Sequence, residues 1–163
     1  MEELARTLGQ RLKAANAMLV TAESCTGGWA AQVATSVAGS SEWFERGFVT
    51  YSNASKEELL GVRAETLRRH GAVSEQTARE MALGALERSR GTVAFSITGV
   101  AGPAGGSEDK PVGTVCFAWA GPKSLLRSET RLFTGDRKAV RRQSVVHALE
   151  GVIDLLDAAR PRS

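Results

Sequence analysis

The chain has 163 residues, of which 42% are apolar and 24% are charged, and its formal net charge is +3. This length and composition indicate one globular domain and exclude a disordered or collagen-like chain. Two cysteines and two histidines are too few for a disulfide framework or a zinc site, so we expect no metal and no other cofactor. The small, dispersed positive charge and the lack of an apolar run of about 20 residues argue against nucleic-acid and membrane partners.

The first predicted element is an amphipathic helix over 2–15, where apolar residues recur at helical spacing. Its acidic start is unlike a signal peptide, so we expect a cytoplasmic protein. A short buried strand over 18–22 follows, and it runs through a turn of small residues into a helix over 29–37. A strand, a tight turn and a helix in this order display the turn at the carboxyl edge of a sheet.

Strands and helices alternate along the rest of the chain. We expect strands over 44–52, 92–98, 114–119 and 124–133, and helices over 54–60, 64–69, 75–88 and from Asp136 to about 156. The predicted helix caps are Ser52 or Asn53, Ser74 and Asp136. This alternation predicts the α/β class, as a single domain over 1–159 that forms a three-layer α/β/α sandwich, with 160–163 as a frayed tail. Because the last two strands are consecutive, the sheet should be mixed, although mostly parallel.

Ser24 lies in the turn that follows the strand over 18–22. The turn places its side chain at the sheet edge, and the amides of Thr26, Gly27 and Gly28 are candidates to hold an oxyanion or a phosphate. Two adjacent glycines let a ligand approach the backbone closely. Taken alone, a serine at such a turn is more often a turn or cap residue than a nucleophile.

Cys25 is the competing nucleophile, because a helix N-terminus lowers the pKa of a thiol. A cysteine nucleophile needs a histidine base, and neither His70 nor His147 stands in a loop with other polar candidates. We therefore expect Cys25 to pack inward as a small hydrophobic side chain.

A serine nucleophile without a Ser-His-Asp arrangement needs a different base, and a lysine held neutral by burial is the natural alternative. Lys56 is the candidate, since it lies in the first turn of the helix over 54–60, where the helix dipole disfavours a positive charge. Tyr51, at the end of the preceding strand, is placed to relay a proton or to orient the base. The ordinary alternatives are an edge-strand aromatic and a solvated lysine, and the residues alone favour these.

The loop over 99–111 is longer than most connections inside a compact domain, which is typical of functional loops. Its glycines allow several backbone amides to converge on an anion, although the spacing is neither a Walker A loop nor a dinucleotide fingerprint. Arg137 and Arg141 are four residues apart on one face of the last helix, and two guanidinium groups on one face suit a phosphate.

Together these segments resemble the CinA C-terminal domain family, and most of all its stand-alone PncC-type nicotinamide-nucleotide amidohydrolases. The resemblance covers nearly the whole chain, in order. The matching segments are Ala22–Gly28, Trp43–Asn53, Lys56, His70–Ser74, Gly99–Pro103, Gly105–Gly106, Lys110–Val115 and Gly135–Arg137. Ala104 departs from the pattern, since many relatives carry a glycine or an acid there.

The resemblance implies an amidase of pyridine nucleotide recycling, which converts nicotinamide mononucleotide to nicotinate mononucleotide and ammonia without a metal. By the same resemblance, Ser24 attacks the carboxamide, Lys56 is the general base and Tyr51 assists it. The implied substrate-binding residues are Thr26, Gly27, Gly28, Thr98, Gly99, Gly102, Pro103, Gly105, Gly106, Arg137 and Arg141.

Two other interpretations stay open: a catalytically inactive nucleotide-binding or regulatory module, and a competence-related partner protein of the same fold. The presence of Ser24, Tyr51 and Lys56 favours the enzyme. Apart from its nucleotide substrate, the partner we expect is a further copy of the chain, with a dimer first among homo-oligomers.

Overall fold

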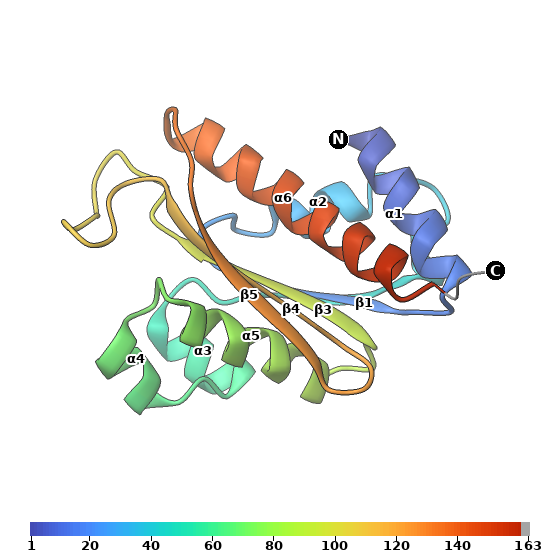
Figure 1. Cartoon of the computed structure of the whole chain (residues 1–163), viewed down its shortest axis with the longest axis horizontal. Helices are drawn as coiled ribbons and strands as arrows, with labels where there is room; N and C mark the ends of the chain where they lie inside the picture. The colour runs from blue at the N-terminus through green and yellow to red at the C-terminus, as the bar shows by residue number, and fades with distance from the viewer. Residues whose placement is uncertain (161–163) are drawn as a thin grey trace.

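The computed structural model describes residues 1–160, in which one β-sheet lies between two layers of helices (Figure 1). Residues 161–163, most of the predicted tail, lie outside the described residues. The strands are β1 (Leu19–Glu23), β2 (Phe44–Val49), β3 (Val93–Gly99), β4 (Thr114–Gly121) and β5 (Leu125–Leu132). The helices are α1 (Glu2–Ala14), α2 (Trp29–Ala34), α3 (Asn53–Leu60), α4 (Ala64–His70), α5 (Glu75–Glu87) and α6 (Arg137–Ala158), with a short 3-10 helix η1 (Ser40–Glu42).

The five strands form one sheet in the order β2-β1-β3-β4-β5. β1 is parallel to both of its neighbours, whereas β4 is antiparallel to β3 and to β5. All strands except β4 therefore run in the same direction. The predicted α/β domain with a mixed, mostly parallel sheet is confirmed.

Helices cover both faces of the sheet: α1, α2 and α6 lie on one side, and α3, α4 and α5 on the other (Figure 1). Side chains of a strand alternate between the two faces, so each face has its own core. Phe95 and Trp119 are buried in the core under α6, whereas Ala94 and Ala118 are buried in the core under α5. The predicted three-layer sandwich is confirmed.

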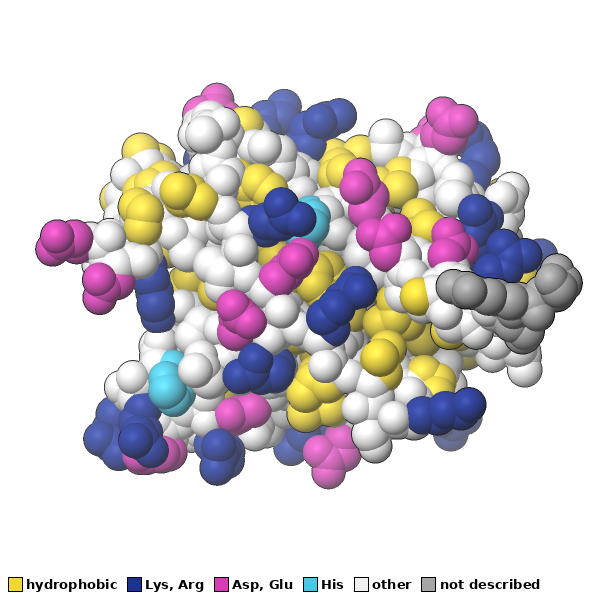
Figure 2. All heavy atoms as spheres, in the orientation of Figure 1, with side chains coloured by type: hydrophobic (Ala, Val, Ile, Leu, Met, Phe, Trp, Pro, Cys, Tyr) yellow, Lys and Arg dark blue, Asp and Glu magenta, His cyan; other side chains and the backbone are white. Residues whose placement is uncertain are grey.

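Charged side chains of both signs are interspersed over the face of the molecule that Figure 2 shows. This face carries no large area of a single sign, which agrees with the dispersed charge of the sequence. Of the helices within residues 1–160, none has the length and apolarity to cross a membrane.

Two elements near the sheet edge end earlier than the sequence predicts. The helix expected over 29–37 ends at Ala34, because Thr35 and Ser36 donate hydroxyl hydrogen bonds back to preceding carbonyl groups. The strand expected over 44–52 ends at Val49.

The Lys56 side chain accounts for the early end of β2. The Thr50 amide still donates to the Glu23 carbonyl of β1. The carbonyl oxygens of Thr50 and Tyr51 then accept hydrogen bonds from the Lys56 amine instead of from a neighbouring strand. The end of β2 is thus shaped by Lys56.

The helix caps follow the sequence closely. Ser74 and Asp136 cap α5 and α6, since each side-chain oxygen accepts a hydrogen bond from the amide three residues later. Of the two candidates at α3, Ser52 is the cap.

Because β1, β2 and β3 are parallel, their carboxyl ends meet at one edge of the sheet. The turn over 24–28, the segment over 50–52 and the loop over 100–113 all leave the sheet there. The N-terminus of α6 approaches the same edge, where Arg137 donates a hydrogen bond to the Gly102 carbonyl.

Candidate active site

The loops that leave this edge enclose a cavity of about 290 Å³. It is lined by Ser24, Cys25, Tyr51, Lys56, Ala72, Val73, Thr98, Gly99, Val100, Ala101, Gly102, Ala104, Gly105 and Arg137. The structure therefore brings together the three predicted catalytic residues, Thr98, three of the loop glycines and Arg137. The other predicted binding residues, which are Thr26, Gly27, Gly28, Pro103, Gly106 and Arg141, lie around the cavity rather than in its lining.

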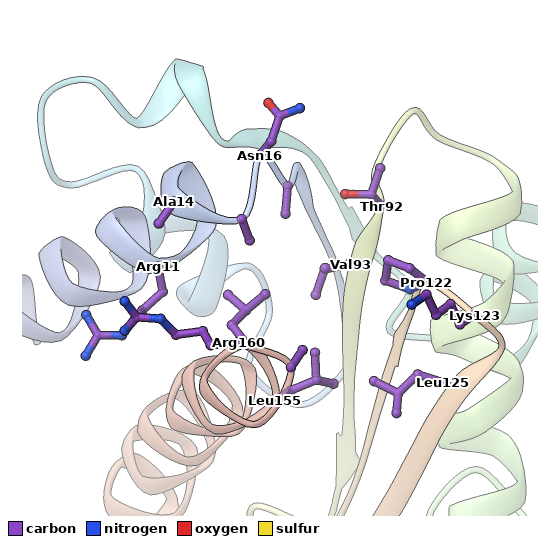
Figure 3. Close-up of a pocket in the computed structure, with 14 residues that line it drawn as sticks. Arg11, Ala14, Asn16, Thr92, Val93, Pro122, Lys123, Leu125, Leu155 and Arg160 are labelled. Atoms are coloured by element: carbon purple, nitrogen blue, oxygen red, sulfur yellow. The ribbon is translucent and has the colours of Figure 1, made fainter. Parts of the chain in front are cut away.

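A larger cavity of about 720 Å³ lies at the opposite end of the sheet, between the ends of α1 and α6 and the hairpin of β4 and β5 (Figure 3). Its floor is mainly apolar, and Arg11, Lys123 and Arg160 are the charged residues in its lining. Its described lining contains no serine, cysteine, histidine or carboxylate. The smaller cavity, which holds a nucleophile beside a base, is therefore the candidate active site.

Ser24 is held by the sheet that precedes it. It comes one residue after β1, and its amide donates to the Ile97 carbonyl of β3 at 2.9 Å. Its side chain is only 7% exposed, and its Oγ lies 3.0 Å from the Lys56 Nζ. The serine is thus fixed at the cavity wall with a basic group in hydrogen-bond contact.

Lys56 is almost completely buried, with 1% of its surface exposed. Besides Ser24 Oγ, its Nζ contacts the carbonyl oxygens of Thr50 at 3.0 Å and Tyr51 at 3.1 Å. Within residues 1–160 it has no carboxylate partner. Burial without a counter-charge disfavours the ammonium form and lowers the pKa of Lys56 from its ordinary value.

Three oxygen atoms surround Nζ, which is also the number of N–H donors on an ammonium. A neutral amine has two N–H donors and one lone pair. In the structure Nζ donates to Ser24 Oγ as well as to both carbonyl groups, and the Ser24 hydroxyl donates to the Tyr51 carbonyl at 3.5 Å. With the two carbonyl groups as acceptors, a neutral Lys56 would keep its lone pair for the Ser24 hydroxyl.

Tyr51 contributes its backbone to the lysine and its side chain to an arginine. Its carbonyl oxygen is one of the acceptors of Lys56 Nζ. Its ring is on the surface, 61% exposed, and its hydroxyl accepts a hydrogen bond from Arg137 Nη2 at 3.3 Å. The contact between Tyr51 and Lys56 is thus made through the carbonyl oxygen, whereas the hydroxyl contacts Arg137.

Cys25 lines the cavity but is 6% exposed. Burial raises the pKa of its thiol to about 11, so the thiol stays protonated at neutral pH. A protonated thiol is a poor nucleophile. The expectation that Cys25 packs as a small hydrophobic side chain agrees with this environment.

Glu23 is a residue that the sequence analysis did not single out. Its fully buried carboxylate accepts hydrogen bonds from the Thr26 hydroxyl at 2.6 Å and from the amides of Ala30 at 2.8 Å and Ala31 at 3.0 Å. It therefore neutralises the N-terminus of α2 and holds the turn that carries Ser24. An acid placed just before a helix start is the sequence signal that points to such a role.

The two arginines of α6 have different neighbours. Arg137 lines the cavity and donates to the Gly102 carbonyl at 2.9 Å. Arg141 reaches the back of the serine turn, where it donates to the carbonyl oxygens of Cys25 at 3.0 Å and Thr26 at 3.2 Å. Of the two, only Arg137 is placed to meet a ligand in the cavity.

The site offers no set of metal ligands. Among residues 1–160, no three histidine, cysteine or carboxylate side chains come together as a metal site would require. The groups that line the cavity include a serine hydroxyl, a buried lysine amine and an arginine.

Comparison with known proteins places the chain in a family. A family model described as the CinA C-terminal domain matches residues 1–156. Over 148 residues the chain is 57% identical to the "Nicotinamide-nucleotide amidohydrolase PncC" of Escherichia coli (strain K12), which covers 91% of this chain and 90% of that protein. The PncC of Pseudomonas putida is 52% identical over 152 residues, with 93% and 94% covered.

Solved structures agree with the sequence comparison. The crystal structure of the competence/damage inducible protein CihA from Agrobacterium tumefaciens superposes with a TM-score of 0.91 at 47% identity, over 94% of each chain. A CinA superfamily protein from Klebsiella pneumoniae gives a TM-score of 0.92 at 39% identity, over 96% of this chain and 98% of that chain. The chain therefore belongs to the CinA C-terminal domain family.

Proposed function

We propose that this chain is an amidohydrolase that converts nicotinamide mononucleotide to nicotinate mononucleotide and ammonia. The observation that carries the proposal is the buried Lys56 Nζ, 3.0 Å from Ser24 Oγ, with two carbonyl groups as its other partners. It occurs in a chain that is 57% identical to a protein named for this activity. A nucleophile beside a neutral base is what amide hydrolysis without a metal requires.

The first half of the reaction forms an acyl-enzyme. Lys56 takes the hydroxyl proton as Ser24 Oγ bonds to the carboxamide carbon, and the carbonyl oxygen becomes an oxyanion. The new ammonium of Lys56 then gives this proton to the amide nitrogen. The carbon–nitrogen bond breaks, ammonia leaves, and the nicotinoyl group remains as an ester of Ser24.

The second half repeats these steps with water. Lys56, neutral again, removes a proton from a water molecule that attacks the ester carbon. The ester bond breaks, Ser24 recovers its proton from Lys56, and the carboxylic acid leaves as its anion. Lys56 alternates between base and acid, and the lowered pKa of its ammonium suits both roles.

The substrate itself favours a neutral lysine. The pyridinium ring of nicotinamide mononucleotide is positively charged and must bind close to Lys56. An ammonium there would repel it, whereas a neutral amine does not. Arg137, at the cavity mouth, is the group we assign to the phosphate of the nucleotide.

The test is release of ammonia from nicotinamide mononucleotide by the purified protein. S24A should abolish turnover while leaving the thermal unfolding transition unchanged, because the Ser24 side chain is small and lies at a cavity wall. The matched control is S41A, which removes an exposed serine of η1 and should keep wild-type activity. Wild-type turnover by S24A would show that Ser24 is not the nucleophile.

The same experiment separates the alternatives. Binding of the nucleotide without ammonia above a boiled control would favour an inactive nucleotide-binding module. Strong, salt-dependent DNA binding in a protein without amidase activity would favour a competence-related partner. We extend the proposal to a cytoplasmic enzyme of pyridine nucleotide recycling that acts as a homo-oligomer, a dimer first, which light scattering of the purified protein would establish.

A further inference from the structure

Arg141 contacts the back of the turn that carries the nucleophile. From α6 its guanidinium donates to the carbonyl oxygens of Cys25 and Thr26, across 116 and 115 residues of sequence. The guanidinium carbon also lies over the Trp29 ring, 5.5 Å from the ring centre. The head group is thus held in place by two carbonyl groups and an aromatic face.

These contacts leave Arg141 poorly placed for a substrate phosphate. It does not line the cavity, whereas Arg137 does. Its Nε and one terminal nitrogen are already used by the turn. The role of a phosphate ligand, which the sequence suggested for both arginines, is therefore open to Arg137 only.

A trans peptide ties the direction of each carbonyl to that of the next amide, because the C=O and N–H of one planar unit point in opposite directions. The Cys25 carbonyl points to Arg141, so the Thr26 N–H points away from it. The Thr26 N–H has no hydrogen-bond acceptor among residues 1–160, whereas the Gly27 N–H donates to the Ser24 carbonyl at 3.0 Å. Thr26 itself is fully buried, and its N–H lies on the side of the peptide opposite to Arg141, next to Ser24 and Cys25, which line the cavity.

The neighbouring peptide is held in the same way. The Ser24 carbonyl accepts the Gly27 amide, which directs the Cys25 N–H to the opposite side. The amides of Cys25 and Thr26 are therefore two consecutive donors beside Ser24. In each peptide unit the carbonyl group is held by a hydrogen bond: the Ser24 carbonyl by the Gly27 amide, and the Cys25 carbonyl by Arg141.

We propose that Arg141 is a positioning residue that holds and polarises the Cys25–Thr26 peptide, so that the Thr26 amide stabilises the oxyanion formed on attack by Ser24. This inference rests on the proposed amidohydrolase function. A charged donor on a carbonyl makes the N–H of the same peptide a stronger donor, and hydrogen-bonded chains reinforce each other. A donor that is fixed before the reaction stabilises a developing charge without a cost of reorganisation.

The test compares R141A and R141K with R142A. Arg142 is the neighbouring arginine and is exposed on α6, so R142A controls for loss of one positive charge. Loss of a whole oxyanion donor lowers kcat by about a hundredfold or more, so R141A should lower kcat by at least about tenfold. KM should change by less than about threefold, since the oxyanion exists only in the transition state. R141K should recover part of kcat, and R142A should match the wild type.

A second measurement separates the transition state from ordinary folding effects. The 3-pyridinecarboxaldehyde analogue of the nucleotide can add to Ser24 and form a tetrahedral oxyanion. R141A should raise the inhibition constant of this aldehyde by at least about tenfold. In contrast, the double variant S24A/R141A should bind nicotinamide mononucleotide nearly as tightly as S24A does. Circular dichroism shows whether each variant is folded. If R141A does not fold, R141K takes its place in both measurements.

The outcomes distinguish the two levels of the proposal. An inactive wild type would overturn the proposed function, and this inference with it. An active wild type with unchanged kcat in R141A would overturn the inference alone. A rise in KM that vanishes for a substrate without the phosphate would also overturn it, because it would make Arg141 a phosphate ligand.

Discussion

Lys56 is the residue whose environment decides the chemistry of the site. It is buried among Ser24 Oγ and two carbonyl groups, and this burial lowers the pKa of its ammonium. Because the proposed mechanism uses the neutral amine as the base, kcat/KM should rise with pH and level off above the folded-state pKa, which lies below the ordinary value of about 10.4. A pH profile of ammonia release measures this.

The variant K56R is the control for that profile. An arginine keeps its proton at every accessible pH, so K56R should lose activity at all pH values rather than shift the midpoint. The free energy of unfolding should also depend on pH. The unfolded chain binds the Lys56 proton more tightly than the folded chain, so this group destabilises the fold below the folded-state pKa. That cost disappears as pH rises toward the ordinary value. A rate that is independent of pH would contradict the assignment of Lys56 as the base.

The backbone and the side chain of Tyr51 make different contacts. Its carbonyl, which any residue supplies, holds Lys56 Nζ, and its hydroxyl contacts Arg137. We therefore expect Y51F to keep kcat within about threefold, whereas a proton relay through the hydroxyl would cost about a hundredfold or more. Steady-state kinetics of Y51F decide between the two, with Y51A as a measure of what the ring itself contributes to KM.

At the scale of elements, the packing of α5 against α3 positions Lys56, the proposed base, because Lys56 lies on α3. Gly84 of α5 faces the end of α3 so closely that an added Cβ would lie 1.8 Å from the Leu60 carbonyl oxygen. Helix propensity alone favours alanine over glycine by about 1 kcal/mol. The close contact with the Leu60 carbonyl should make alanine less stable than glycine here, because a backbone carbonyl cannot move aside as the end of a side chain can.

We expect G84A to lower the free energy of unfolding by about 1–3 kcal/mol, as overpacked core positions do. It should also lower kcat, because displacement of α3 displaces Lys56. Urea unfolding measures the first effect. The control is L83A, which changes the exposed neighbour and should stay within about 0.5 kcal/mol of the wild type. Higher stability of G84A would mean that α3 moves away at no cost.

At the scale of the whole molecule, the order of the strands creates the site. β1 is central to the three parallel strands, so the residues after β1, β2 and β3 meet at one edge, and α6 brings Arg137 and Arg141 to it from the end of the chain. The opposite end of the sheet has the larger cavity but no group that begins amide hydrolysis (Figure 3). The location of the candidate active site thus follows from strand direction and not from cavity size.

The sequence by itself determined the local structure. Periodicity predicts the helices and strands, side-chain oxygens predict the caps Ser74 and Asp136, and the turn after the first strand predicts that Ser24 is displayed. These features depend on residues a few positions apart, which is why one sequence suffices. Local patterns did not make Ser24 a nucleophile. The family resemblance led to that prediction, and the family membership is confirmed, whereas the role of Ser24 stays a prediction.

Tertiary structure decided what the side chains of the site do. Lys56 is buried against Ser24 across 32 residues of sequence, the Tyr51 hydroxyl meets Arg137 across 86, and Arg141 meets the serine turn across 116. No spacing rule reaches that far, because such contacts are set by how the strands and α6 pack. Two residues that looked alike in sequence, Arg137 and Arg141, therefore contact different segments: Arg137 the Gly102 carbonyl and the Tyr51 hydroxyl, and Arg141 the serine turn. The sequence alone pointed to Ser24 as a displayed side chain, whereas only the tertiary structure showed that Lys56 and Arg141 contact it and its turn.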